Sequence, residues 1–243
     1  MPSPTRPPSA AERAVAWGGA AAFAASLLYF LFSYDVTFTR DLDGALKTGD
    51  VAWDVALFSL FALHHSLFAR LGIRASVQRT FGALERSVYV WIASALLILV
   101  CAYWRPVAGL VWQMYGLSAW LLRLAHVFGV GLSVASAAAI DIWDLAGVRQ
   151  VAAGGSKEQD PPYAEFKTTG PYGLVRHPIY LGWLLIVFAV PHMTMTRLVF
   201  AVISSVYVLI AIPLEERSLL ASTAGAYDRY RQKVRFRLIP RLY

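Results

Sequence analysis

Long apolar runs separated by short polar segments dominate this chain. A helix of about 20 residues is long enough to cross the ~30 Å hydrocarbon core of a bilayer. Four runs come close to that length: 14–34, 52–69, 85–104 and 119–140. We therefore expect four membrane-spanning helices in the first 140 residues.

Two shorter apolar pieces lie near the end of the chain. Residues 179–190 would reach only about 18 Å as a helix, Pro191 interrupts the pattern, and residues 198–214 continue it. These pieces predict a helical hairpin that need not cross the bilayer completely. The expected fold class is therefore all-α: a polytopic helical membrane protein with four spans and a C-terminal helical hairpin, about six membrane helices in total.

The composition supports a membrane protein rather than a soluble domain. Of the 243 residues, 58% are hydrophobic and only 15% are charged, and the mean hydropathy is +0.52. The single Cys101 excludes an intramolecular disulfide or a cysteine metal cluster, and the five histidines are too scattered to predict a metal site. We expect a disordered lead-in over 1–13, four transmembrane helices over 14–140, and a separate region over 141–243.

Basic residues are distributed unevenly between the two sides of the expected bundle. The chain has 22 Lys and Arg residues and a formal net charge of +7. Most of these residues fall in the segments on the same side as the N-terminus, which predicts that both termini are cytoplasmic. The first span is too long for a signal-peptide core, so we expect it to remain in the mature protein. The expected partners are membrane lipids with anionic headgroups at the cytoplasmic face, and no nucleic acid.

The stretch 170–182 carries a dense set of polar and special-geometry residues. Pro178 suits the first turn of a helix, so Arg176 and His177 should lie at that helix's N-terminus, which accepts anions. The acidic pair Glu215-Glu216 follows at the end of the last apolar piece. We expect the acids and the stretch to converge on one cytoplasmic pocket.

These motifs also resemble a known family. Gly-Pro-Tyr and Val-Arg-His-Pro-Ile-Tyr-Leu-Gly within 170–182, Glu-Glu-Arg over 215–217 and Ile-Pro-Arg over 239–241 resemble the membrane methyltransferases typified by isoprenylcysteine carboxyl methyltransferase. Residues 63–66 (Leu-His-His-Ser), together with 85–87 and 144–150, resemble the branch that methylates methanethiol to dimethyl sulfide, and its NnrU-like relatives. His64 departs from that branch, where a glutamine is expected.

The resemblance implies that the region 141–243 binds S-adenosyl-L-methionine and catalyses methyl transfer. Arg176 and the helix end at Pro178 would suit the carboxylate of this cofactor, and Glu215 and Glu216 its ammonium. No dinucleotide-binding fingerprint is present, so helix ends would form the pocket. The residues assigned to the cofactor are Gly170, Tyr172, Arg176, His177, Pro178, Tyr180, Gly182, Glu215 and Glu216.

The favoured reaction is methyl transfer to a small thiol such as methanethiol. A thiol is mostly protonated at neutral pH, so a basic or cationic neighbour is needed, and His65 and Arg149 are the candidates. The tail, residues 217–241, is expected to fold back as a lid, with Tyr227 and Tyr230 on one helix face.

Three alternatives stay open. The protein could be an isoprenylcysteine carboxyl O-methyltransferase or a phospholipid N-methyltransferase, both of which need room for a long apolar chain. It could also be an NnrU-like non-catalytic membrane protein of nitrogen-oxide metabolism, although the intact Arg-His-Pro and Glu-Glu motifs argue against this. The expected location is the bacterial inner membrane with the active site facing the cytoplasm, while the oligomeric state cannot be predicted.

Overall fold

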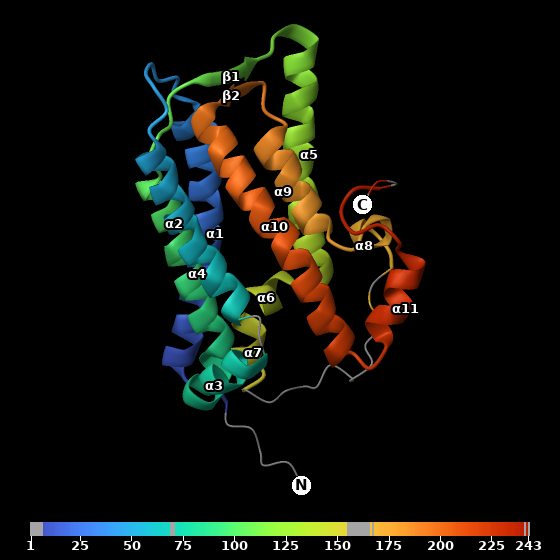
Figure 1. Ribbon diagram of the computed structural model, residues 1–243. Helices are drawn as coiled ribbons and strands as arrows, with labels where there is room; N and C mark the ends of the chain where they lie inside the picture. The colour runs from blue at the N-terminus through green and yellow to red at the C-terminus, as the bar shows by residue number, and fades with distance from the viewer. Residues whose placement is uncertain (1–6, 69–70, 155–165, 167, 241, 243) are drawn as a thin grey trace.

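The computed structural model describes residues 7–68, 71–154, 166, 168–240 and 242. They form a bundle of roughly parallel and antiparallel helices (Figure 1). Its long helices are α1 (Ala10–Asp35), α2 (Thr48–Phe68), α4 (Glu85–Tyr103), α5 (Gly116–Ile140) and α10 (Met195–Ser222), and a shorter helix, α9 (Pro178–Phe188), packs among them. The expectation of a polytopic helical membrane protein is confirmed at this level.

Four helical segments of the described chain are long and apolar enough to cross a membrane. They are Ala10–Thr39, Ser76–Tyr103, Gly116–Ile140 and Met195–Ser222. The two arms of the expected C-terminal hairpin therefore differ. α10 has 28 residues, about 42 Å at 1.5 Å per residue, whereas α9 has 11 residues and reaches only about 16 Å.

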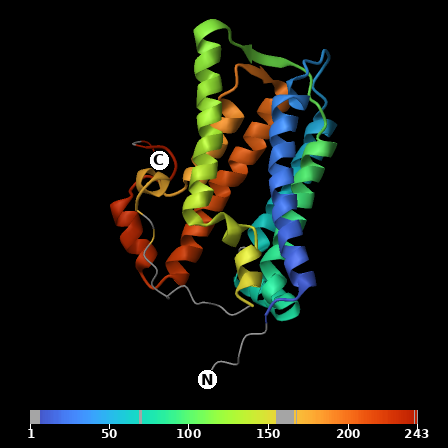
Figure 2. The same cartoon turned by 180° about the vertical axis from the view of Figure 1, so that it is seen from behind.

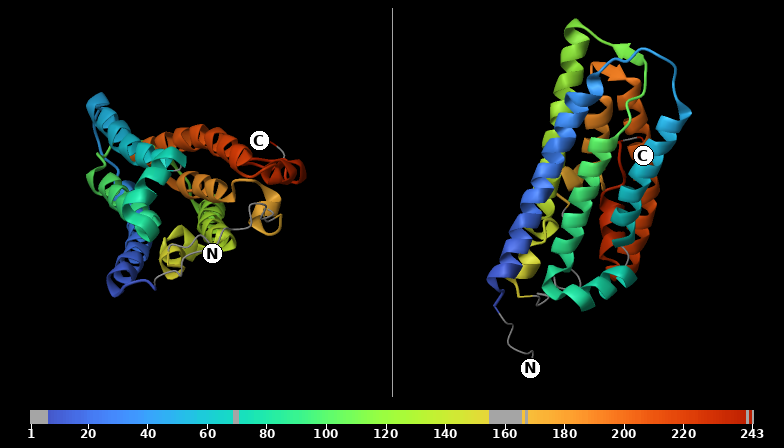
Figure 3. Two further views of the ribbon diagram at one scale, coloured as in Figure 1. Left: turned by 90° about the horizontal axis from the view of Figure 1, so that it is seen from below. Right: turned by 90° about the vertical axis from the view of Figure 1, so that its left-hand side faces the viewer.

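The long helices form two groups that lie side by side when the bundle is seen along its axis (Figure 3). α1 packs on α4, which also contacts α2, and α5 packs on α9. α10 contacts both α9 and α2 and so joins the two groups. The start of α1 and the end of α10 lie at the same end of the bundle (Figures 1 and 2).

The first helix begins earlier than the hydrophobic pattern suggests. The Ser9 hydroxyl accepts a hydrogen bond from the Glu12 backbone N–H, and the Glu12 carboxylate accepts one from the Ser9 N–H. This reciprocal capping box satisfies two otherwise unpaired donors of the first turn. The helix therefore starts at Ala10 and not at residue 14.

The all-α expectation is wrong in one respect, because the structure contains a small sheet. β1 (Leu110–Gln113) pairs antiparallel with β2 (His192–Thr194). The sheet closes the end of the bundle opposite the start of α1 (Figure 1). Trp112 lies in β1 and donates its indole N–H to the Val190 carbonyl.

Several short helices and turns connect the long helices or follow them. One is α3 (Leu71–Phe81), which follows α2. The 3-10 turns are η1 (Thr37–Thr39) and η2 (Gly82–Leu84), and the remaining short helices are α6 (Ile142–Leu145), α7 (Val148–Ala152), α8 (Pro171–Leu174) and α11 (Ala226–Lys233).

An aromatic core lies around Phe200, near the start of α10. The Phe200 ring of α10 is surrounded by the rings of Phe30 and Tyr34 from α1, Trp104 after α4 and Trp183 from α9, with centroids 5.0 to 6.0 Å apart. Burying a large aromatic side chain contributes about 1.5–3 kcal/mol. This core therefore anchors α9 against α1 and α10.

α9 also approaches α5 unusually closely. A Cβ added to Gly182 would lie 2.3 Å from Ser133 Oγ and 2.7 Å from the Gly129 carbonyl oxygen. Only a residue without a side chain permits this contact, which holds α9 alongside α5. The amino end of α9, where Pro178 lies, is thereby fixed part-way along the bundle and not at its end (Figures 1 and 2).

Candidate functional site

Three separate segments meet at the amino end of α9. They are the turn between α8 and α9, the last part of α10, and the tail that follows α11. The Arg176 backbone N–H donates to the Phe236 carbonyl, and the His177 N–H donates to the Arg237 carbonyl, both at 2.9 Å. The tail therefore folds back along the Arg-His-Pro motif, as expected, and its role as a lid stays a prediction.

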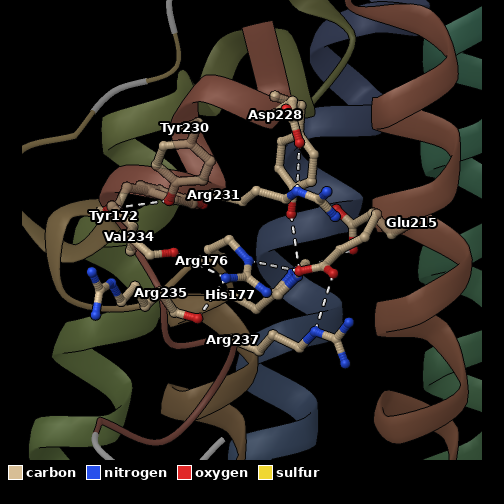
Figure 4. A network of polar contacts seen from close by, with 12 residues as sticks. Tyr172, Arg176, His177, Glu215, Asp228, Tyr230, Arg231, Val234, Arg235 and Arg237 are labelled. Atoms are coloured by element: carbon tan, nitrogen blue, oxygen red, sulfur yellow. Dashed lines mark hydrogen bonds and ion pairs between the residues drawn. The ribbon is translucent and has the colours of Figure 1, made fainter. Parts of the chain in front are cut away.

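Glu216 is the centre of this meeting point. Its Oε1 accepts from Arg176 Nε at 2.7 Å and from the Tyr227 hydroxyl at 3.0 Å, and lies 3.3 Å from His177 Nε2. Its Oε2 accepts from Arg237 Nε at 3.1 Å. Figure 4 shows these contacts converging between the turn, α10 and the tail. Such charge-assisted bonds are stronger than neutral ones, so Glu216 ties three segments together.

Arg176 pairs directly with Glu216, and their predicted roles in binding the cofactor stay predictions. Their side chains are only 8% and 6% exposed, and Arg176 Nη1 also donates to the carbonyls of Val234 and Arg235 at 2.9 and 2.7 Å. We expected one to bind the cofactor carboxylate and the other its ammonium. In the structure the two charges neutralise each other and hold the tail.

Glu215 has a different environment although it is the next residue. Its side chain is 47% exposed. The Tyr180 hydroxyl donates to its Oε2 at 3.1 Å, and His177 Nδ1 lies 3.7 Å from the same oxygen. The His177 and Tyr180 rings stack with centroids 5.6 Å apart. Glu215 is thus a positioned, accessible carboxylate.

The remaining residues of the motif have distinct local roles. Gly170 precedes α8 with a φ of 62° and ψ of −143°, a conformation that L side chains rarely adopt. Pro178 is in the first turn of α9, as predicted. Gly182 faces Gly129 and Ser133 of α5, so the close approach it permits is to a helix.

Aromatic residues of the tail pack against the motif. The Tyr230 hydroxyl donates to the Tyr172 carbonyl at 2.8 Å, and the Phe166 ring contacts the rings of Tyr227 and Tyr230 at 5.2 and 5.4 Å. Burial raises the pKa of Tyr230 to about 12. Burial, together with the nearby Glu216 charge, also raises the pKa of Tyr227. Burial and the Glu215 charge raise the pKa of Tyr172, so the hydroxyls of all three tyrosines stay neutral at physiological pH.

The two candidate catalytic residues lie in different surroundings. His65, near the end of α2, has its Nδ1 2.6 Å from the Tyr89 hydroxyl, and its ring contacts that of Tyr207 at 6.3 Å. Arg149 in α7 is 66% exposed, and its Nε lies 2.5 Å from Asp141 Oδ2. The structure places His65 in an aromatic cluster and Arg149 at the surface.

Tyr207 of α10 contacts the end of α2 that carries His65. The Ser66 hydroxyl donates to Tyr207 Oη at 3.4 Å, and Tyr207 is close enough to Tyr180 and Glu215 to act on both electrostatically. Neither Tyr207 nor Tyr89 was among the residues predicted to form the site. One signal was available, because Tyr207 and Glu215 are eight residues apart and therefore share a face of α10.

Comparison with known proteins identifies the family. Over 92% of this chain and 87% of the relative, it is 38% identical to methanethiol S-methyltransferase 2 of Bradyrhizobium diazoefficiens. It is also 34% identical to the methanethiol S-methyltransferase of Mycobacterium tuberculosis, over 87% of this chain and 91% of that protein. The chain belongs to the methanethiol S-methyltransferase family. Its activity class is therefore methyl transfer.

A more distant likeness extends the relationship. The chain is 32% identical to nurim of Xenopus laevis over 63% of its length and 57% of nurim. This match joins the methyltransferase to the wider membrane family typified by isoprenylcysteine carboxyl methyltransferase, so the resemblance drawn from its motifs is confirmed. No family model and no solved structure matches the chain.

Proposed function

We propose that this protein transfers the methyl group of S-adenosylmethionine to a small thiol, with methanethiol as acceptor and dimethyl sulfide as product. The supporting observation is that the Glu215 carboxylate is accessible and lies at the helix end that carries the Arg-His-Pro motif. The relatives of this chain are methanethiol S-methyltransferases. A carboxylate held in this way suits a cationic ligand. The alternative acceptors lack a comparable supporting observation.

The polar groups at the amino end of α9 fit the amino-acid part of S-adenosylmethionine. When bound, this cofactor supplies an electrophilic methyl group on a positively charged sulfur. Glu215 would face the ammonium. Two arginines contact Glu216, and Arg237 is the more exposed of them, with 38% of its side chain accessible. Arg237 would face the carboxylate of the cofactor. Arg176 and Glu216 would position these two residues through their own ion pair.

The stacked rings of His177 and Tyr180 would hold the rest of the cofactor beside Glu215. The Tyr180 hydroxyl already orients that carboxylate. Tyr207 contacts His65 and is near enough to Glu215 to interact with its charge, so we assign the acceptor to the His65 cluster. The predicted roles of Gly170, Tyr172 and Pro178 are then to shape the turn that carries these residues.

The thiol must lose its proton before its sulfur attacks the methyl group. If His65 Nδ1 carries a proton and donates to Tyr89 Oη, then Nε2 is basic and takes the thiol proton. A thiolate and a sulfonium become two neutral thioethers, so a water-poor aromatic surrounding favours the reaction. Arg149 would have to leave Asp141 to contribute, which makes His65 the stronger candidate.

An acceptor panel tests the proposal. Purified protein would be incubated with methyl-labelled S-adenosylmethionine and either methanethiol, a prenylcysteine or phosphatidylethanolamine, and label would be measured in each product. We expect labelled dimethyl sulfide. If only the prenylcysteine ester or only the lipid were labelled, that compound would be the acceptor in place of methanethiol. No label with any acceptor would favour a non-catalytic protein.

We further propose that the site faces the cytoplasm of a bacterial inner membrane, because of the basic segments around it.

A further inference from the structure

An open cavity with several charged lining residues lies at the opposite end of the bundle from Glu216. It measures about 500 Å³ and lies between the end of α1, the first part of α5 and the turn that joins α9 to β2. This is the end that carries β1 and β2 (Figure 1). Ligand pockets commonly have volumes of about 300–1,000 Å³. Its polar and aromatic lining includes Asp35, Trp120, Arg123, His126, His192 and Arg197.

One wall of the cavity is a buried arginine fixed in place by α1 and β2. Arg197 Nε donates to the Tyr34 carbonyl at 2.9 Å, Nη1 donates to the His192 carbonyl at 2.5 Å, and Nη2 lies 3.4 Å from Asp35 Oδ1. Its side chain is only 5% exposed. The guanidinium is therefore a permanent positive charge at this wall.

The hydrogen-bond geometry of His126 indicates a second positive charge in the cavity. Its Nδ1 lies 2.9 Å from the Ile186 carbonyl oxygen, and its Nε2 lies 3.3 Å from Asp35 Oδ2. Both partners only accept hydrogen bonds, so both ring nitrogens must carry protons to satisfy them. The imidazolium form fits this arrangement, and Asp35 is then shared by two cations.

Arg123 brings a third cation to the cavity. Its guanidinium carbon lies 5.4 Å from the Trp120 ring centroid on the same helix. Three cations therefore line a cavity whose only acidic lining residue, in the part of the chain that the structure describes, is Asp35. The cavity has a positive excess and is suited to an anion.

The surroundings of the cavity indicate an anion with apolar chains. Val127 lines the cavity and is 65% exposed on α5. Leu124 and Phe128 extend the same exposed apolar surface along the helix. A Trp and an Arg near the end of a membrane helix are typical of the headgroup level. We propose that this cavity binds the phosphate of an anionic phospholipid, whose acyl chains lie along α5.

The test uses the full chain in a neutral detergent with short-chain lipids. Dioctanoyl phosphatidylglycerol should bind saturably and raise the melting temperature. Dioctanoylglycerol, which lacks the phosphate, should do neither. Arg123→Gln should weaken phosphatidylglycerol binding about tenfold or more, as expected for the loss of one charge-assisted contact. Arg123 is exposed, so this variant should fold normally.

Arg40→Gln is the matched control, because Arg40 is exposed just after η1 and does not line the cavity. It should bind phosphatidylglycerol like the unmodified chain. Equal binding of dioctanoylglycerol, or unchanged affinity in Arg123→Gln, would overturn the proposal. Inorganic phosphate that bound as tightly as the lipid, with the same dependence on Arg123, would identify a free anion as the ligand and would also overturn it.

Discussion

Glu215 and Glu216 are adjacent in the chain, yet they have different environments. Successive residues of a helix point about 100° apart, so Glu216 turns toward Arg176 and the tail while Glu215 turns toward Tyr180. The Glu216 carboxylate has four polar partners and is only 6% exposed, so it stabilises the fold. A half-exposed carboxylate with a single hydroxyl donor is suited to binding a ligand.

Glutamine substitutions should separate these two roles. Glu215→Gln should weaken S-adenosylmethionine binding about 10- to 100-fold, since a hydrogen bond to a charged group contributes about 1.5–3 kcal/mol, with little change in melting temperature. Glu216→Gln should destabilise the fold by about 3–5 kcal/mol, because it leaves Arg176 buried without its counter-charge. Calorimetric titration and thermal unfolding would measure the two effects.

Asp228→Asn is a suitable control, because it removes a partly exposed carboxylate of α11 whose described contacts are to Arg231 and Gln232 on the same helix. Surface ion pairs contribute about 0–1 kcal/mol, so neither quantity should change much. If Glu216→Gln lost cofactor affinity but kept its stability, the original assignment of Glu216 to the ammonium would be correct after all.

His65 gives a second prediction at the scale of single residues. His65→Ala should slow thiol methylation about 10- to 100-fold while cofactor affinity stays nearly constant, because the lost group acts on the acceptor. The defect should shrink as pH rises, since the thiol then ionises without help. Rates across a pH series, compared with Arg149→Ala, would measure it.

The exposed Arg149 should have the smaller effect of the two. A larger defect in Arg149→Ala would mean that this side chain moves into the site during the reaction. If His65→Ala reduced cofactor binding and turnover equally, then His65 would contribute to the cofactor pocket or to the stability of the fold, and not to the activation of the thiol.

Among the structural elements, the long helices could be predicted well and the short elements could not. α4 and α5 begin and end within three residues of the expected spans at 85–104 and 119–140, because burial in lipid requires one continuous apolar run. β1 and β2 were missed because each is only three or four residues long and pairs with a segment about 80 residues away. Such pairing leaves no local pattern.

The extent of α10 was also underestimated. The apolar run ends at Leu214, next to Pro213, and we placed the end of the hairpin there. The helix continues to Ser222, because the charged turn after Pro213 is held by Arg176, Tyr180 and the tail. Those contacts come from distant parts of the chain and cannot be read from the local sequence.

The contact between α9 and α5 gives a prediction at this scale. Gly182→Ala should destabilise the protein by about 1–3 kcal/mol, the usual effect of overpacking, because its Cβ would meet Ser133 Oγ and the Gly129 carbonyl. Gly131→Ala on α5 is the control, since no atom of the described residues lies within 4 Å of the added Cβ. Thermal unfolding of both variants measures the effect.

This comparison also tests the assignment of Gly182 to the cofactor. If helix packing is its role, the folded fraction of Gly182→Ala should bind S-adenosylmethionine normally once unfolded protein is accounted for. A specific loss of affinity at unchanged melting temperature would return Gly182 to the cofactor pocket.

At the scale of the whole molecule, the polar groups separate into two ends. The Glu216 network and the basic tail occupy the part of the bundle nearer the chain termini, while Asp35, Arg197 and the small sheet occupy the other end. The sequence predicted this separation, because the positive-inside rule and the helix count depend only on the order of apolar and basic segments. It could not predict that α9 starts part-way along the bundle, since that depends on Gly182 meeting α5.

The membrane orientation of this arrangement is the remaining prediction. Cys101 is buried, so a Cys101→Ala background allows single reporter cysteines to be introduced. Asp43→Cys lies in the α1–α2 connection and Ser222→Cys in the last turn of α10, both at exposed positions and at opposite ends of the bundle (Figure 1). In spheroplasts treated with a membrane-impermeant maleimide, Asp43→Cys should be labelled, and Ser222→Cys should be labelled only after permeabilisation. The reverse pattern would place the Glu216 network outside the cytoplasm, where S-adenosylmethionine made in the cell could not reach it, and would contradict the proposed function together with the topology.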